Sequence, residues 1–150
     1  MKPIEIQVTA RSSKTPQQLC TGFLDTERWP EFEGYLFLPG VQKAEVVLRT
    51  QDMVGTRIRV QNTDGSSHVE EIIEWDPARR IAVQFGEFQP PLSRLATHFV
   101  ETWQFRETDQ GTEITRGMEM VPKGMIGWLM LRMVAILMKK AFEKQMGAKY

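Results

Sequence analysis

The feature that most constrains the fold is a long apolar segment, Met125 to Met138, near the end of the chain. It follows Pro122 and is predicted to begin a helix that extends to about Met146. The segment contains Gly127 and Arg132 and is shorter than the roughly 18–20 residues that a membrane-spanning helix needs. We therefore interpret it as a helix that is buried against the rest of the protein or lies at an interface.

Most of the chain before this segment alternates apolar and polar residues, which is the period of β-strands with one buried face. The first such segment runs from Ile4 to Ala10. The residues predicted to face inward on six further strands are Ala44, Val46 and Leu48, then Thr56, Ile58 and Val60, then Val69, Glu71, Ile73 and Trp75, then Ile81, Val83 and Phe85, then Phe99, Glu101, Trp103 and Phe105, and finally Ile114, Arg116, Met118 and Met120. The turn sequence Asn62-Thr63-Asp64-Gly65 predicts a hairpin between two of them.

Between the first and second strands, the residues Ser13 to Thr15 and then Pro16 form a helix-start pattern, and Trp29-Pro30 stops the helix. One or two short helices are predicted there. A sheet with one apolar face must be covered, and the C-terminal helix is the only predicted element long enough to cover it. We therefore predict an α+β fold in which a seven-stranded, curved antiparallel sheet wraps around the C-terminal helix. This helix is apolar on nearly every side, as expected for a helix that a curved sheet grips.

Length and composition indicate how many domains the chain forms and which kinds of partner and compartment to expect. The 150 residues suit a single domain, predicted to span residues 1–150. Nineteen basic residues balance nineteen acidic ones, so no nucleic-acid partner is expected. Cys20 is the only cysteine, which excludes an intramolecular disulfide and fits a reducing compartment. The N-terminal residues alternate where a signal peptide would be continuously apolar, so we expect a cytoplasmic protein.

Several short motifs accompany this order of elements. They are Thr26-Glu27-Arg28-Trp29-Pro30-Glu31-Phe32, Pro39-Gly40-Val41, Val54-Gly55-Thr56, Glu74-Trp75-Asp76-Pro77-Ala78-Arg79-Arg80 and Gly111-Thr112-Glu113-Ile114-Thr115. With them, essentially the whole chain resembles the START-like, Bet v 1-like (SRPBCC) superfamily, in particular its bacterial polyketide cyclase/dehydrase and lipid-transport branch. The resemblance implies a helix-grip fold with a cavity for a hydrophobic or amphipathic small molecule between the sheet and the C-terminal helix. Members range from carriers to cyclases, so the fold does not choose between these functions.

Three charged residues, Glu71, Glu101 and Arg116, fall on faces predicted to point inward. A charge placed there costs several kcal/mol unless it is paired or reaches water. Pairing the last two strands through a turn at residues 108–111 places Trp103 opposite Arg116, and Glu101 one diagonal step away. We therefore predict that Arg116 stacks on Trp103 while it bonds to Glu101.

These residues have two interpretations. In the first, they form the polar anchor of an apolar ligand pocket. The candidate ligand-binding residues are Phe85, Phe99, Glu101, Trp103, Arg116, Met118 and Met133. In an enzyme, Glu101 or Glu71 would move protons and Arg116 would stabilise an enolate or a carboxylate. In the second interpretation, Glu101 and Arg116 form an internal ion pair that touches no ligand.

The remaining reactive side chains point to no further chemistry. His68 and His98 fall on the polar faces of their strands and are predicted to lie at the surface, not to act as bases or metal ligands. Cys20 is predicted to be an inert buried thiol. The sequence has no metal-ligand spacing and no glycine-rich phosphate loop, so no metal and no cofactor are expected.

Two loops are apolar where most loops are polar. One contains Tyr35 and Phe37, and the other, residues 87–94, contains Phe88, Pro91 and Leu92. They form a gate over the cavity mouth, contact a membrane or a partner, or fold back onto the core. A homodimer through this surface fits the sequence equally well.

Three functions are consistent with these patterns. The favoured one is a carrier or sensor that binds a lipid-, isoprenoid- or polyketide-like molecule between the sheet and the C-terminal helix. The second is a polyketide cyclase, aromatase or dehydratase that uses the same cavity. The third is a module that contacts another protein or, transiently, a membrane surface.

Overall fold

The computed structural model describes residues 2–149 of the chain. Seven strands form one antiparallel sheet in the order β1-β7-β6-β5-β4-β3-β2. The strands are β1 (Ile4–Ser12), β2 (Val41–Leu48), β3 (Arg57–Asn62), β4 (Ser67–Asp76), β5 (Arg80–Gly86), β6 (Ala96–Thr108) and β7 (Gly111–Pro122). The helices are α1 (Pro16–Phe23), the 3-10 helix η1 (Thr26–Glu31), the short α2 (Leu92–Leu95) and the long α3 (Gly124–Lys149). The predicted α+β helix-grip architecture is confirmed.

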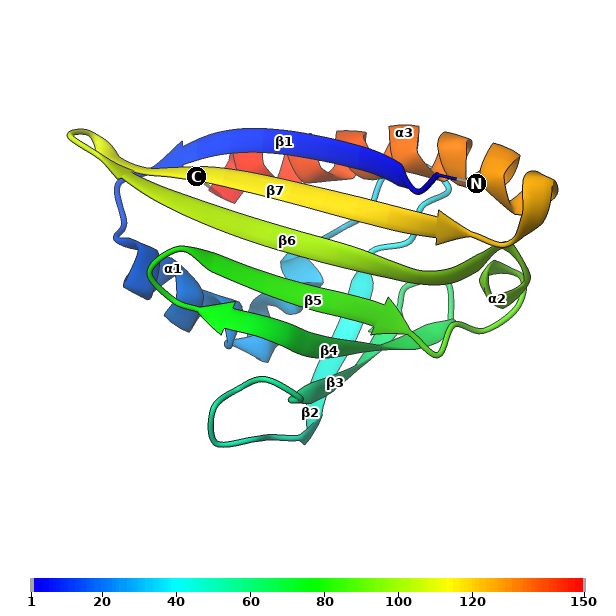
Figure 1. Cartoon of the computed structure of the whole chain (residues 1–150), viewed down its shortest axis with the longest axis horizontal. Helices are drawn as coiled ribbons and strands as arrows, with labels where there is room; N and C mark the ends of the chain where they lie inside the picture. The colour runs from blue at the N-terminus through cyan, green and yellow to red at the C-terminus, as the bar shows by residue number, and fades with distance from the viewer. Residues whose placement is uncertain (1, 150) are drawn as a thin grey trace.

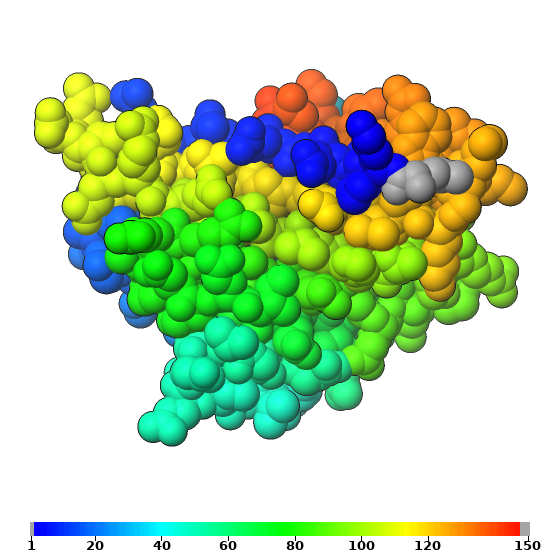
Figure 2. Space-filling view, viewed as in Figure 1, coloured from blue at the N-terminus to red at the C-terminus, as the bar shows by residue number. Residues whose placement is uncertain are grey.

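The sheet is strongly curved, and α3 runs along the β1 and β7 side of it (Figure 1). Strands β2 and β3 turn away from the plane of β1, β7 and β6. The segment between β2 and β3 projects from the body of the molecule, which the space-filling view shows from the same side (Figure 2). This curvature leaves a concave inner face between the sheet and α3.

Local sequence explains where α1 begins. Thr15 is its N-cap residue, and its Oγ1 accepts a hydrogen bond from the backbone N–H of Gln18 at 3.2 Å. The side-chain oxygen of Gln18 accepts in return from the backbone N–H of Thr15 at 2.9 Å. This reciprocal capping, with Pro16 in the first turn, satisfies backbone donors that a helix start leaves unpaired. The helix buries Cys20 against the inner face of the sheet.

Helix α3 packs on the sheet through one face only. Leu131, Ala135, Met138 and Phe142 recur at helical spacing and are buried against β6 and β7 residues. The opposite face exposes six apolar side chains, each between 45% and 74% accessible: Met125, Ile126, Leu129, Met130, Met133 and Ile136. We call these residues the α3 stripe. The interpretation of this segment as a buried helix therefore holds for one face only, because a single sheet covers one side of a helix. None of the helices among the described residues is long and apolar enough to cross a bilayer.

Strand β4 contains a β-bulge that changes which residues face inward. Ile72 pairs with Val83, but the next pair is Glu74 with Ala82, so Ile73 is an extra residue. Trp75, after the bulge, packs against the core as predicted. Before the bulge the parity reverses, and Glu70 and Ile72 are the buried residues. The prediction that Glu71 faces inward is therefore wrong.

Candidate ligand-binding site

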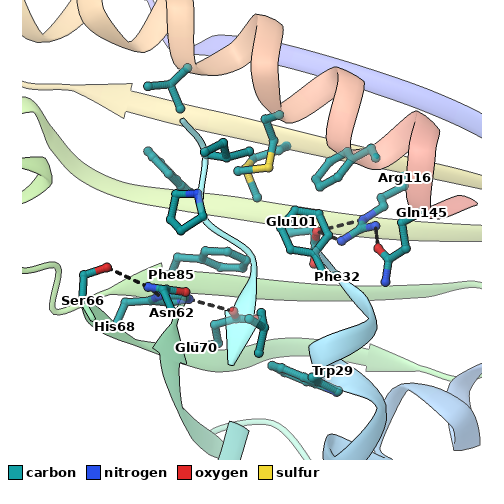
Figure 3. Close-up of a pocket in the computed structure, with 18 of the residues that line it drawn as sticks. Trp29, Phe32, Asn62, Ser66, His68, Glu70, Phe85, Glu101, Arg116 and Gln145 are labelled. Atoms are coloured by element: carbon teal, nitrogen blue, oxygen red, sulfur yellow. Dashed lines mark hydrogen bonds and ion pairs between the residues drawn. The ribbon is translucent and has the colours of Figure 1, made fainter. Parts of the chain in front are cut away.

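The inner face of the sheet and α3 border a cavity of about 710 Å³. Side chains from α1, from η1 and from the loops after η1 and β5 complete its lining. Six aromatic residues provide much of the apolar surface: Phe32, Phe85, Phe88, Phe99, Trp103 and Phe142. Figure 3 shows polar side chains of the site together with the labelled rings of Phe32 and Phe85. Volumes of roughly 300–1,000 Å³ are typical of small-molecule pockets.

The first polar group in the cavity is centred on Arg116. Its Nε donates to Oε2 of Glu101 at 2.9 Å, and its Nη2 lies 2.8 Å from the same oxygen. Nη1 donates to Oε1 of Gln145 on α3 at 2.6 Å. The other oxygen of Glu101 accepts from the indole N–H of Trp103 at 3.1 Å. We call these four residues the Arg116 cluster. The predicted register, with Trp103 opposite Arg116, and the predicted ion pair are confirmed.

Aromatic rings stack on the guanidinium of Arg116. The guanidinium carbon of Arg116 lies 3.8 Å from the ring centroid of Phe142 and 4.3 Å from that of Trp103. Such contacts strengthen when the cation is desolvated, as it is here. Arg116 is therefore paired and stacked within the protein, and Glu101 accepts hydrogen bonds at both of its oxygens. The cluster ties β6 and β7 to α3.

The second polar group was missed by the sequence analysis. His68 Nε2 lies 2.9 Å from Oε2 of Glu70, and His68 Nδ1 lies 3.2 Å from Nδ2 of Asn62. Asn62 Nδ2 also donates to Oγ of Ser66, which bonds in turn to Asp64. We call these five residues the His68 cluster, and all five line the cavity. The prediction that His68 lies at the surface is wrong for the same reason as for Glu71: the bulge after Ile72 reverses the parity of the first half of β4.

One sequence signal indicates this reversal. Ile72 and Ile73 are adjacent apolar residues in an otherwise alternating strand, and such a doublet marks a place where alternation breaks. Across the sheet, Glu70 lies between Ile58 on β3 and Phe85 on β5. The His68 ring stacks on Phe85 with centroids 5.2 Å apart and an interplanar angle of 16°. An apolar ring thus holds the imidazole in place.

Burial governs the titration of two groups. Loss of water around Glu70 is the largest effect on its carboxyl and raises its pKa. The hydrogen bond and charge of His68 and the charge of Arg116 oppose this rise, and the Glu101 carboxylate adds to it. For Cys20, burial and the nearby Asp76 raise the pKa to about 11, and the thiol donates to the carbonyl oxygen of Pro77 at 3.3 Å.

The other predicted site residues divide into two groups. Phe85, Phe99, Glu101, Trp103, Arg116 and Met118 line the cavity, and their role in ligand binding stays a prediction. Met133 is 64% exposed on the α3 stripe, so its predicted place in the pocket is wrong. Val134, Leu137 and Met138 of α3 line the cavity instead. Glu71 lies on the outer face of the sheet, where its Oε1 is 2.9 Å from Nη1 of Arg57.

The two apolar loops border the cavity. Phe37 is 94% exposed at its edge, while the Phe88 ring packs on Phe99 with centroids 4.9 Å apart. Pro91 and Leu92 also line the cavity. Tyr35 does not belong to the lining and instead pairs through its backbone with Leu38. Within residues 2–149, no group of three or more histidine, cysteine, aspartate or glutamate side chains is placed to hold a metal ion.

Solved structures share this fold along nearly the whole chain. The protein TTHA0849 from Thermus thermophilus superposes with a TM-score of 0.70 at 20% identity, over 95% of this chain and 91% of that one. Ara h 8.0201 gives a TM-score of 0.62 at 16% identity, over 98% and 99% of the two chains. The di-domain ARO/CYC BexL, from the BE-7585A biosynthetic pathway, gives 0.71 at 14% identity, over 97% of this chain and 48% of that one.

At these identities the structural likeness shows the fold alone. No curated protein matches the sequence. The model of one protein family, described as polyketide cyclase / dehydrase and lipid transport, matches residues 3–148. The cavity, the grip of the sheet on α3 and this match along the chain lead to one assignment: the chain belongs to the polyketide cyclase / dehydrase and lipid transport family.

Proposed function

We propose that this protein binds an amphipathic small molecule of the lipid, isoprenoid or polyketide kind in its cavity, as a carrier or sensor. The observation that carries the proposal is a cavity of about 710 Å³ whose aromatic lining is broken by two compact polar clusters. An apolar ligand body gains free energy by leaving water for such a lining, and a few polar groups orient it. The family description, which includes lipid transport, supports this function. The unpaired thiol of Cys20 supports the cytoplasm as its location.

The enzyme alternative has weaker support. The family description and the fold of BexL favour a cyclase-type activity. An acid–base residue must be within hydrogen-bond reach of the substrate atom that it serves. In the Arg116 cluster both oxygens of Glu101 already accept hydrogen bonds from the protein, and Arg116 is paired with Glu101. This arrangement favours binding over proton transfer at Glu101.

Native mass spectrometry of the purified protein tests the proposal, together with organic extraction and identification of any bound molecule. Binding of the neutral dye Nile red gives an independent readout. Met133→Glu is the matched control, because it removes apolar surface from the α3 stripe and leaves the cavity lining unchanged. We expect a co-purified or added amphipathic molecule, and equal dye binding by the control variant. Dye fluorescence that disappears in Met133→Glu would locate the dye on the helix surface and contradict the proposal.

A second function is favoured by the α3 stripe. We propose that the stripe makes transient contact with an anionic membrane surface. Six exposed apolar side chains in one helix form a larger patch than isolated surface residues do. The chain from 123 to 142 contains no acidic residue, and Lys123, Arg132, Lys139 and Lys140 are all exposed there. Basic residues beside an exposed apolar helix face match the charge of anionic lipid headgroups.

Co-sedimentation with vesicles tests this contact. We expect the protein to sediment with phosphatidylglycerol vesicles and much less with phosphatidylcholine vesicles, and Met133→Glu to reduce sedimentation. Size-exclusion chromatography of the same two proteins distinguishes the homodimer, because a dimer through the stripe would dissociate in Met133→Glu. A dimer of that kind, with no vesicle binding, would contradict the membrane contact.

A further inference from the structure

Glu70 offers the cavity an oxygen that the protein itself does not use. Its Oε2 accepts from His68 at 2.9 Å. Among the described residues nothing donates to its Oε1, and no fully buried side-chain oxygen in residues 2–149 lacks a partner. Oε1 therefore retains access to open space, and Glu70 lines the cavity. This oxygen is therefore a carboxylate acceptor that a ligand in the cavity can reach.

The hydroxyl of Ser66 fixes which atoms donate and which accept in the His68 cluster. Ser66 Oγ carries a single hydrogen, which it donates to Oδ1 of Asp64 at 2.6 Å. It must therefore accept from Nδ2 of Asn62, at 3.1 Å. The second hydrogen of the same amide points to Nδ1 of His68, so the imidazole carries its proton on Nε2 and donates it to Glu70. The chain of donors ends at Glu70, which it stabilises as a hydrogen-bond acceptor.

The buried charges of the cavity do not cancel. The structure has three buried charged side chains among the described residues, namely Glu70, Glu101 and Arg116. Arg116 is already paired with Glu101, with N–O distances of 2.8 and 2.9 Å, and the Phe142 ring covers one face of its guanidinium. Glu70 has only the imidazole of His68 beside it. A ligand group that reaches Glu70 therefore meets an acceptor with no buried cation free to neutralise it.

We propose that Glu70 binds the polar end of the ligand, and that this end is a hydrogen-bond donor, either a hydroxyl or a protonated amine. The inference rests on the proposed binding function and names the ligand chemistry of that same cavity. The aromatic neighbours of the cluster fit the apolar body of such a molecule, because Phe85 pairs with Glu70 across the sheet and contacts Phe99 with centroids 6.3 Å apart. A carboxylate or phosphate end would meet the lone acid and would be disfavoured.

Displacement of Nile red from the full chain at neutral pH tests the inference with three competitors that share one alkyl tail: decylamine, decan-1-ol and decanoate. We expect decylamine and decan-1-ol to displace the dye at concentrations at least about tenfold below that of decanoate, since an ammonium or a hydroxyl can donate to Oε1 of Glu70 and a carboxylate cannot. In Glu70→Gln this gap should shrink to about threefold or less. The matched control is Glu71→Gln, which changes the neighbouring acid on the outer face and should keep the wild-type gap. A larger loss for decylamine than for decan-1-ol in Glu70→Gln assigns the ligand a cationic end, and an equal loss for the two assigns it a donor that needs no charge, a hydroxyl.

The wild-type comparison keeps the inference falsifiable even if Glu70→Gln does not fold. Decanoate that competes as well as decylamine would overturn it while leaving the binding function intact. An unchanged preference in a folded Glu70→Gln protein would do the same. If neither the dye nor any of the three competitors binds the wild-type protein, the binding function itself fails, and the inference fails with it.

Discussion

Arg116 on β7 donates a 2.6 Å hydrogen bond to Gln145 on α3. The same guanidinium is ion-paired with Glu101 on β6 and stacks on Phe142. A single buried cation thus joins two strands and the C-terminal helix. The hypothesis of an internal ion pair, one of the two interpretations of this sequence pattern, therefore has direct geometric support. Ligand contact by Arg116 stays a prediction.

Replacing Arg116 tests its structural role. Arg116→Met leaves the Glu101 carboxylate buried without its cation, and we expect a loss of roughly 3–5 kcal/mol in the free energy of unfolding. The double variant Arg116→Met/Glu101→Gln should recover part of this loss, since it removes the stranded charge. Urea denaturation measures both. The exposed pair Arg106–Glu113 is the control, and Arg106→Ala should cost about 1 kcal/mol or less. A single variant as stable as this control would refute the role.

The free energy of unfolding should depend on pH in a way that reflects the titration of Glu70. Burial raises the pKa of its carboxyl, so the folded state keeps this proton to a higher pH than the unfolded state does. Between the ordinary and the raised pKa, the folded state binds more protons, and the contribution of this group to stability falls as pH rises. Glu70→Gln removes that dependence. The free energy of unfolding of the variant minus that of the wild type should therefore increase from acidic to neutral pH.

Denaturation with urea at a series of pH values measures this difference. Glu71→Gln provides the comparison, because Glu71 pairs with Arg57 on the outer face of the sheet. A flat difference for Glu70→Gln, or the same slope in both variants, would show that Glu70 is not the group responsible.

Two glycines of α3 should respond in opposite directions to alanine. A Cβ at Gly127 would lie 2.3 Å from the backbone oxygen of Leu95, so Gly127→Ala must push α3 away from α2. We expect a cost of about 1–3 kcal/mol, typical of overpacking. Gly147 has no atom within 4 Å of the same position, and Gly147→Ala should stabilise the helix by up to about 1 kcal/mol. Thermal unfolding of both variants, followed by circular dichroism, gives the comparison. Equal effects would argue against the close contact between α2 and α3.

Cys20 should be unreactive in the native protein. Its thiol has a pKa of about 11 and is 1% exposed, so the reactive thiolate is scarce and shielded at neutral pH. A chromogenic aromatic disulfide should label it slowly in buffer and rapidly in urea. Fast labelling under native conditions would mean that α1 separates readily from the sheet.

Periodicity was enough to predict the architecture, because seven alternating segments and one long apolar helix admit few arrangements. It also placed Trp103 opposite Arg116, since a short hairpin turn fixes the register of its two strands. Periodicity failed at β4, because strict alternation from Val69 to Trp75 passes over the bulge at Ile73. That error exchanged Glu70 for Glu71 and hid the His68 cluster.

The buried face of α3 could not be predicted from the sequence pattern. A helix that is apolar on all sides carries no periodic signal for its buried face, so Met133 and Met138 were equivalent in the sequence. The structure buries Met138 and exposes Met133. Packing against one concave sheet, rather than local composition, decides between them.

The extra residue in β4 has a consequence for how this cavity can change over evolutionary time. Deleting Ile73 would make Ile72–Val83 and Glu74–Ala82 consecutive pairs and would leave Glu70, Ile72 and Trp75 on the inner face. If Ile73 instead joined the ladder, the first half of the strand would shift by one position, so that Val69 and Glu71 turn inward and His68 and Glu70 turn outward. Loss of the bulge can thus exchange the acid that faces the cavity while every side chain is still encoded. The pairing register of one strand, as well as amino-acid substitution, is therefore a heritable control of what such a pocket recognises.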